Sequence, residues 1–201
     1  MLKNVYIAGG MRTPFGAFNG SLAALTAPEL GSVAIRAALQ KAGVDPKEVD
    51  EVLFGNVLGA GVGQNPARQA SLGAGLGVEV GATTINKVCG SSLRAVILAA
   101  QAIQCGDARL IVAGGCESMT NAPYLLRKAR SGYRMGHGEL IDAMIYDGLW
   151  DVYTSRHMGT CGDQCATKYN ISREDQDTFA IESYTRAIRA SNSPEFGCDA
   201  S

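Results

Sequence analysis

The stretch from Ala82 to Gly115 constrains the fold more than any other part of the chain, because strand, helix and strand patterns follow one another without a break. Residues 82–88 have the β-branched character of a strand, and residues 93–103 are apolar nearly all round, as in a buried helix. Gly106 is a typical helix stop, and residues 109–113 read as a second buried strand. This order predicts two parallel strands joined by a crossover helix.

The same alternation extends towards the N-terminus. Residues 4–8 read as a strand, and a helix with capping-box spacing at its start is predicted over residues 26–42. A further strand is predicted within residues 49–58, and an Asn-Pro pair opens a helix over residues 65–73. The fold class is therefore α/β, with a mixed, mostly parallel sheet that carries helices on both faces.

The character of the chain changes near residue 119. Residues 120–169 contain glycines, charges and little strand-like alternation, and Ser172 then caps a helix that continues to about Ala190. We therefore divide the chain into an α/β domain over residues 1–119 and an excursion over residues 120–201.

Composition excludes several classes of protein. An apolar content of 46% in 201 residues is ample for a core, and a net charge of −1 gives no general attraction to nucleic acid or anionic lipid. The longest apolar stretch, residues 93–103, is short for a bilayer and contains Arg94, so no membrane segment is expected. The six cysteines have no framework spacing, which predicts reduced thiols and a cytoplasmic protein.

Cys89 is the main candidate for chemistry, because it lies between the predicted strand and the predicted helix of the central unit. At the carboxyl edge of a parallel sheet, next to a helix N-terminus, a thiol has its pKa lowered and becomes nucleophilic. The alternative is that Cys89 is a small buried apolar residue, since free cysteine is among the most buried residue types. Position alone leaves both interpretations open.

Other candidates are weaker. His137 and His157 are the only histidines and hence the only imidazoles that could act as a base for Cys89. Cys161 and Cys165 are one helical turn apart, but no second pair completes a ligand set, so no metal site is predicted. Cys116 follows a strand end, where packing is the favoured role. A basic, glycine-rich segment over residues 127–138 is interpreted either as a solvated loop or as a contact with an anion or another subunit.

Four stretches together resemble the thiolase family. Residues 86–92, Asn-Lys-Val-Cys-Gly-Ser-Ser, are similar to the nucleophile motif of the family, and residues 114–124 to the strand and turn that follow it. Residues 63–70 and 132–138 match as well. The resemblance runs from residue 1 to about residue 189 and is closest to the biosynthetic acetoacetyl-CoA thiolases, the acetyl-CoA C-acetyltransferases.

The resemblance implies an acyltransferase in which Cys89 takes an acetyl group from acetyl-CoA and an acetyl-CoA enolate then attacks it; thiolysis is the reverse. Coenzyme A thioesters are the implied substrates, with no separate cofactor. Leu149, His157 and Met158 are implied to line the pocket for the pantetheine arm and acyl group. Residues 120–201 are implied to be part of a substrate-binding and tetramerisation loop domain. The implied partner is a second copy, as dimer or tetramer, or a complementary thiolase half.

The chain also departs from the family pattern. Ser92 stands where the family has glycine, next to the nucleophile. Thiolases have two similar halves, and the second supplies a Gly-His-Pro histidine, an asparagine motif and a Cys-x-Gly cysteine, which are not among these 201 residues. We therefore expect the 201 residues alone to be inactive or severely impaired in turnover. The alternatives are a non-catalytic thiolase-like protein that binds CoA compounds or a thiolase subunit, and a cysteine hydrolase that uses His157.

Overall fold

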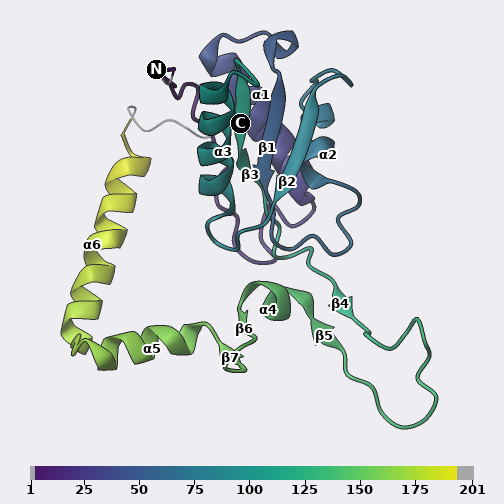
Figure 1. The fold of residues 1–201 in the computed structure, drawn as a ribbon. Helices are drawn as coiled ribbons and strands as arrows, with labels where there is room; N and C mark the ends of the chain where they lie inside the picture. The colour runs from purple at the N-terminus through teal and green to yellow at the C-terminus, as the bar shows by residue number, and fades with distance from the viewer. Residues whose placement is uncertain (1–2, 194–201) are drawn as a thin grey trace. The chain divides into compact units, whose positions relative to one another are not determined.

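Figure 1 shows the computed structural model of the protein, which describes residues 3–193. Residues 3–148 form one compact unit and residues 149–193 form a second. The predicted division into domains 1–119 and 120–201 rests on a change in composition and stays a prediction.

A three-stranded parallel sheet organises the first unit, with β1 (Glu51–Gly55) between β2 (Gly81–Ile85) and β3 (Ile111–Gly115). The register aligns Gly55 with Ile85 on one side and with Gly115 on the other. All three strands therefore end at the same edge. The predicted strand–helix–strand unit is confirmed, and an earlier strand lies between its two strands.

Helices cover both faces of this sheet (Figure 1), as the sequence predicts. On one face, α1 (Ala27–Ala42) and α2 (Pro66–Gly73) pack with Val52 and Phe54 of β1 in one core cluster. On the other face, α3 (Ser91–Cys105) packs with Leu53, mainly through Ala95 and Ala99. Because neighbouring residues of a strand face opposite ways, three consecutive residues of β1 serve both cores.

The predicted helix starts and stops are confirmed where short-range signals specify them. Thr26 and Glu29 form a reciprocal capping box on α1, and Gly43 ends that helix in the left-handed conformation, with φ at 65°. The hydrogen bonds from Thr26 hold the pKa of the Glu29 carboxyl below its usual value. Asn65 caps α2 by accepting the N–H of Arg68 at 3.3 Å, and it also accepts the hydroxyl of Thr84, in β2, at 2.6 Å.

Two predictions about the first unit are wrong. Residues 4–8 form no strand; Tyr6 and Ile7 are exposed, and no strand among the described residues pairs with them. The helix over residues 93–103 is not buried all round, because Leu93 is 66% exposed and Ile97 is exposed as well. Residues 88–105 are long and apolar enough by length and composition to cross a membrane, yet their inner face packs on the sheet as a crossover helix does.

Short elements complete the two units. In the first, β4 (Tyr124–Leu125) pairs antiparallel with β5 (Ile141–Asp142), and α4 (Ala143–Gly148) follows. A 3-10 turn at Pro46–Glu48 precedes β1. The second unit comprises the antiparallel pair β6 (Trp150–Asp151) and β7 (Arg156–His157), then α5 (Gly159–Lys168) and α6 (Arg173–Ser191). Ser172 caps α6, as its sequence predicts.

Candidate active site

Cys89 lies in a tight turn between the end of β2 at Ile85 and the start of α3 at Ser91. Its side chain is exposed, so the interpretation of Cys89 as a small buried apolar residue is wrong. The sulfur is at the carboxyl edge of the parallel sheet, where open α/β proteins bind their ligands. A thiol in this place is accessible to a substrate that approaches the edge.

The residue before the cysteine has an unusual backbone. Val88 has φ at 47°, in the left-handed region that β-branched residues rarely adopt. Asn86 accepts the Val88 N–H through Oδ1 at 2.9 Å, and Ser91 accepts the Lys87 N–H through Oγ at 2.9 Å. The turn is thus held by side-chain hydrogen bonds from both of its ends.

Helix α3 points its N-terminus towards this turn. Gly90 is the N-cap, and no side chain caps the helix. The free N–H groups of a first helical turn carry partial positive charge, which favours negative charge nearby. Cys89 directly precedes the N-cap, so this residue lies at the end of the helix that favours negative charge.

Two glycines allow α3 to approach the sheet so closely. A Cβ on Gly55 would lie 2.7 Å from Cβ of Ser91 and 2.8 Å from the backbone nitrogen of Ser92. A Cβ on Gly115 would lie 2.9 Å from the Gly55 carbonyl oxygen and would collide with the Ser92 hydroxyl. Ser92, the departure from the family pattern, therefore uses space that Gly115 leaves open.

Glu117 ties the ends of β1 and β3 together beside the same edge. Its carboxylate accepts the side-chain N–H of Asn56 at 2.8 Å and the backbone N–H groups of Val57 at 2.8 Å and Leu58 at 3.1 Å. Asn56 is buried and also donates to the Cys116 carbonyl oxygen at 3.1 Å. Charge-assisted hydrogen bonds of this kind are stronger than neutral ones, so the network fixes the loop after β1.

Cys116 packs in the core on the face that α1 and α2 cover. Burial, with a smaller effect from the neighbouring Glu117 charge, raises the pKa of its thiol to about 12. The thiol therefore stays protonated at neutral pH and has no nucleophilic role. The favoured packing role of Cys116 is confirmed.

The three residues implied in substrate binding meet in one hairpin of the second unit. Leu149 precedes β6 and accepts the N–H of Met158 at 2.8 Å, and His157 pairs with Trp150 across the two strands. His157 Nδ1 accepts the N–H of Gly159 at 3.1 Å, which leaves Nε2 as the N–H of the neutral ring. Their role in binding stays a prediction.

Further cysteines are free thiols elsewhere in the fold. Cys105 is exposed at the C-terminal end of α3, and Cys161 and Cys165 lie one turn apart in α5. Within residues 3–193, no three His, Cys, Asp or Glu side chains gather in a way that could hold a metal ion. Cys198 lies outside the described residues.

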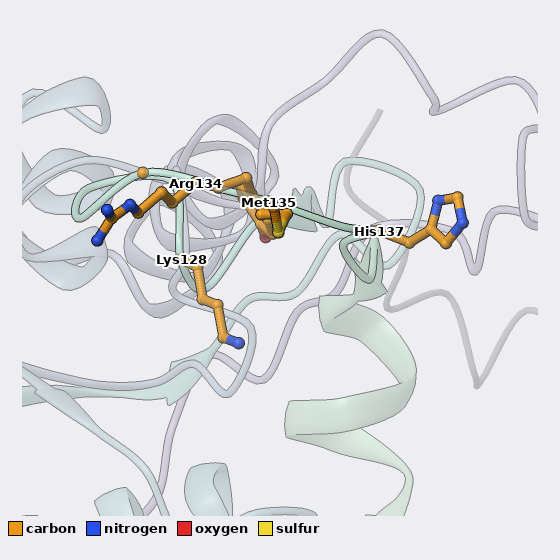
Figure 2. A pocket seen from close by; sticks show the side chains of 6 residues that line it. Lys128, Arg134, Met135 and His137 are labelled. Atoms are coloured by element: carbon orange, nitrogen blue, oxygen red, sulfur yellow. The ribbon is translucent and has the colours of Figure 1, made fainter.

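The basic segment forms an open pocket of ≈ 490 Å³ in the loop between β4 and β5. Figure 2 shows that the side chains of Lys128, Arg134 and His137 point in different directions around Met135. Because these groups do not converge, the pocket lacks the directed donors of a built anion site. His137 lines this loop pocket.

Sequence reasoning missed three residues that shape the edge. Ser91 is part of the motif over residues 86–92, but the sequence predicts no role for its side chain, for Asn56 or for Glu117. Glu117 follows a predicted strand end, where a carboxylate commonly faces the active edge, and this signal could have found it. The partners of Ser91 are backbone groups of a turn whose conformation the sequence pattern does not reveal.

Comparison with known proteins shows which family this chain resembles. Residues 5–199 match the sequence profile of the family described as "Thiolase, N-terminal domain". Acetyl-CoA acetyltransferase 1 of Arabidopsis thaliana is 54% identical over 194 residues, which cover 96% of this chain and 47% of that protein. The acetyl-CoA acetyltransferase of Cupriavidus necator is 54% identical over 195 residues, covering 97% and 50%. That of Pseudomonas aeruginosa is 54% identical over 189 residues, covering 94% and 48%. The chain spans about half the length of these relatives.

Proposed function

The chain belongs to the thiolase family, and we propose that it carries the nucleophile of an acyltransferase that joins two molecules of acetyl-CoA into acetoacetyl-CoA and CoA, and that catalyses the reverse thiolysis. One observation carries the proposal: Cys89 is an exposed thiol, held in a strained turn at the carboxyl edge of a parallel sheet. The names of the similar proteins, all acetyl-CoA acetyltransferases, support the choice of substrate.

In the first half-reaction, the Cys89 thiolate attacks the carbonyl carbon of acetyl-CoA. A carbon–sulfur bond to Cys89 forms, the carbon–sulfur bond to CoA breaks, and CoA leaves as a thiolate that takes up a proton. The carbonyl oxygen carries negative charge in between. The backbone N–H of Cys89 at the start of α3, together with the positive end of the helix, is suited to stabilise it.

In the second half-reaction, C2 of another acetyl-CoA loses a proton and attacks the acetyl group on Cys89. A carbon–carbon bond forms, the carbon–sulfur bond to Cys89 breaks, and the thiolate is regenerated. By the family resemblance, the proton passes to the Cys-x-Gly cysteine of the second thiolase half. Leu149, His157 and Met158, which one hairpin brings together, are proposed to contact the pantetheine arm and the acyl group.

The proposal extends to the substrates, the oligomeric state and the compartment in which the protein works. CoA thioesters are substrates, and no separate cofactor takes part. The working form is a homo-oligomer or a pair of complementary thiolase halves, in the cytoplasm. Free thiols at Cys89, Cys105, Cys116, Cys161 and Cys165 support a reducing compartment. Sedimentation of the protein at several concentrations tests the oligomer, and a concentration-independent monomer would contradict it.

Mass spectrometry after incubation with acetyl-CoA tests the function. We expect one acetyl group on the peptide that contains Cys89, absent in Cys89→Ser. Cys105→Ser is the matched control, because it removes an exposed thiol at the far end of α3, the helix that follows Cys89, and should leave acetylation unchanged. For the 201 residues alone, we propose acetylation without turnover.

The outcomes separate the proposed function from its alternatives. Binding of acetyl-CoA without acetylation of Cys89 would favour a non-catalytic thiolase-like binder. Rapid release of acetate would favour a cysteine hydrolase. Acetylation that persists in Cys89→Ser would show that another residue is the nucleophile.

A further inference from the structure

We propose that Ser91 is a positioning residue, which holds Val88 in its left-handed backbone conformation and thereby fixes how Cys89 is presented. The inference rests on the proposed role of Cys89 as nucleophile. Ser91 acts on Cys89 through its hydrogen bonds to the turn.

The side chain of Ser91 bridges two successive residues of the turn. Its Oγ accepts the backbone N–H of Lys87 at 2.9 Å and donates to the carbonyl oxygen of Val88 at 2.5 Å. The backbone N–H of Ser91 donates to the same Val88 carbonyl at 3.1 Å. Ser91 thus forms hydrogen bonds with Lys87 and Val88, the two residues immediately before Cys89, through both its side chain and its main chain.

We call these three hydrogen bonds of Ser91 the clamp. The turn needs the clamp because the backbone of Val88 is strained. A left-handed backbone is unfavourable for L-residues because Cβ crowds the following carbonyl oxygen, and a branched Cβ makes the crowding worse. The Val88 side chain is 52% exposed, so core packing contributes little to holding it. The hydrogen bonds to the Val88 carbonyl, with the Asn86 contact to its N–H, are what maintain φ at 47°.

The clamp itself rests on a rigid support. Ser91 is 4% exposed and begins α3, and a Cβ on Gly55 would lie only 2.7 Å from its Cβ. The hydroxyl is therefore held at one position relative to the end of β1. The turn is therefore supported by the packed sheet rather than by a flexible loop.

Burial alone does not account for this serine. Ser71 in α2 is fully buried too, and its Oγ has no hydrogen-bond partner among the described residues. A buried serine in this protein can therefore serve as a small packing residue. Ser91 differs because its hydroxyl spans the turn that presents the exposed thiol.

The first test measures the alkylation of individual cysteines by iodoacetamide, between pH 5 and 10, in Ser91→Ala. We expect the rate at Cys89 to fall about fivefold, because the relaxed turn no longer presents the sulfur at the helix N-terminus. Cys105 at the far end of α3 is the internal control and should react as before.

Ser92→Ala is the matched control variant. It makes the same substitution at the next residue, an exposed serine, and alanine retains the Cβ while it removes the hydroxyl. Its Cys89 alkylation rate should match that of the parent protein. Loss of reactivity in Ser92→Ala equal to that in Ser91→Ala would overturn the proposal, because the effect would then not depend on the clamp.

A rescue experiment separates positioning from packing. Glycine adopts positive φ without strain, so Val88→Gly should keep the turn in place without the Ser91 hydroxyl. In the Val88→Gly background we therefore expect Ser91→Ala to slow Cys89 alkylation less than twofold, against about fivefold with valine present. The same factor in both backgrounds would overturn the proposal.

The readout keeps the proposal distinct from the proposed function. Alkylation by iodoacetamide does not require acetyl-CoA. If Cys89 does not become acetylated, the proposed thiolase chemistry is refuted, but the effect of Ser91→Ala on alkylation still tests the role of Ser91. If Ser91→Ala unfolds the protein, Cys105 and the buried Cys116 become equally reactive. The comparison is then made in the Val88→Gly background, where a fivefold effect of Ser91→Ala on the Cys89 rate would overturn the proposal.

Discussion

The α/β layer of the first unit and the helices of the second unit are stabilised in different ways. Phe54 of β1 lies in a core cluster with α1 and α2, whereas none of the residues of α5 or α6 is buried. Helix α6 has instead a capping box and ion pairs one turn apart, Arg173 with Asp177 and Arg186 with Glu182. Exposed pairs of this kind contribute little, so local signals define α6 while packing defines the layer.

The difference bears on where chemistry can be placed. A strained backbone such as Val88 persists only where its surroundings over-determine it. The packed layer meets that condition, because Ser91 is fixed against β1 and Glu117 ties the strand ends together. An unpacked helix offers no comparable support.

Substitution of one phenylalanine in each unit tests this difference in stabilisation, and we expect the largest effect from this pair. Phe54→Ala removes a ring that is 4% exposed and should lower the free energy of unfolding by about 3–5 kcal/mol. Phe179→Ala in α6 removes a ring that is 78% exposed and should change it by less than about 0.5 kcal/mol. Urea unfolding followed by circular dichroism measures both. Equal effects would show that α6 packs as tightly as β1.

A matched pair of glycines gives an intermediate effect. Gly55→Ala forces a methyl group against Ser91 and Ser92 and should destabilise the layer by about 1–3 kcal/mol. Gly162→Ala in α5 meets nothing within 4 Å and should stabilise that helix by about 0.5–1 kcal/mol. Unfolding curves and hydrogen exchange of α5 measure the two changes. A neutral Gly55→Ala would mean that α3 does not need its close approach to β1.

The two capping boxes give the smallest effect. Thr26→Ala and Ser172→Ala each remove an N-cap hydroxyl, which typically contributes about 1 kcal/mol to a helix. Because α1 is part of the core, Thr26→Ala should lower the global unfolding free energy. Ser172→Ala should instead increase hydrogen exchange only in the first turns of α6. A global loss of stability from Ser172→Ala would contradict the contrast.

Acid should reveal the same difference, because the caps hold the pKa values of Glu29 and Asp175 below their usual values. A carboxylate with a lowered folded-state pKa contributes stability above its unfolded pKa, about 4, and loses it as the pH falls through the folded value. Below about pH 4 we therefore expect the start of α6 to fray locally. Loss of the α1 cap in the same pH range should lower the free energy of unfolding of the whole α/β layer. Glu29→Gln should remove the α1 part of this pH dependence.

Much of the fold could be predicted because its signals are short-range. The boundaries of α1 and α2 follow from Thr26, Glu29, Gly43 and the Asn65-Pro66 pair, each within a few residues of the helix end that it specifies. Of the candidate site, the place of Cys89 at a strand–helix junction could be predicted in the same way. Its exposure could not, because exposure depends on which segments cover the edge.

The sequence by itself determined the alternation of elements, the helix caps and the family of this protein. Only the tertiary structure decided that residues 4–8 form no strand, that α3 is open on its outer face, and that Ser91 clamps Val88. The physical reason is the range of the interactions. A cap is satisfied within one turn of helix, whereas a strand needs hydrogen bonds from a distant strand, and a strained turn needs a support that other segments build.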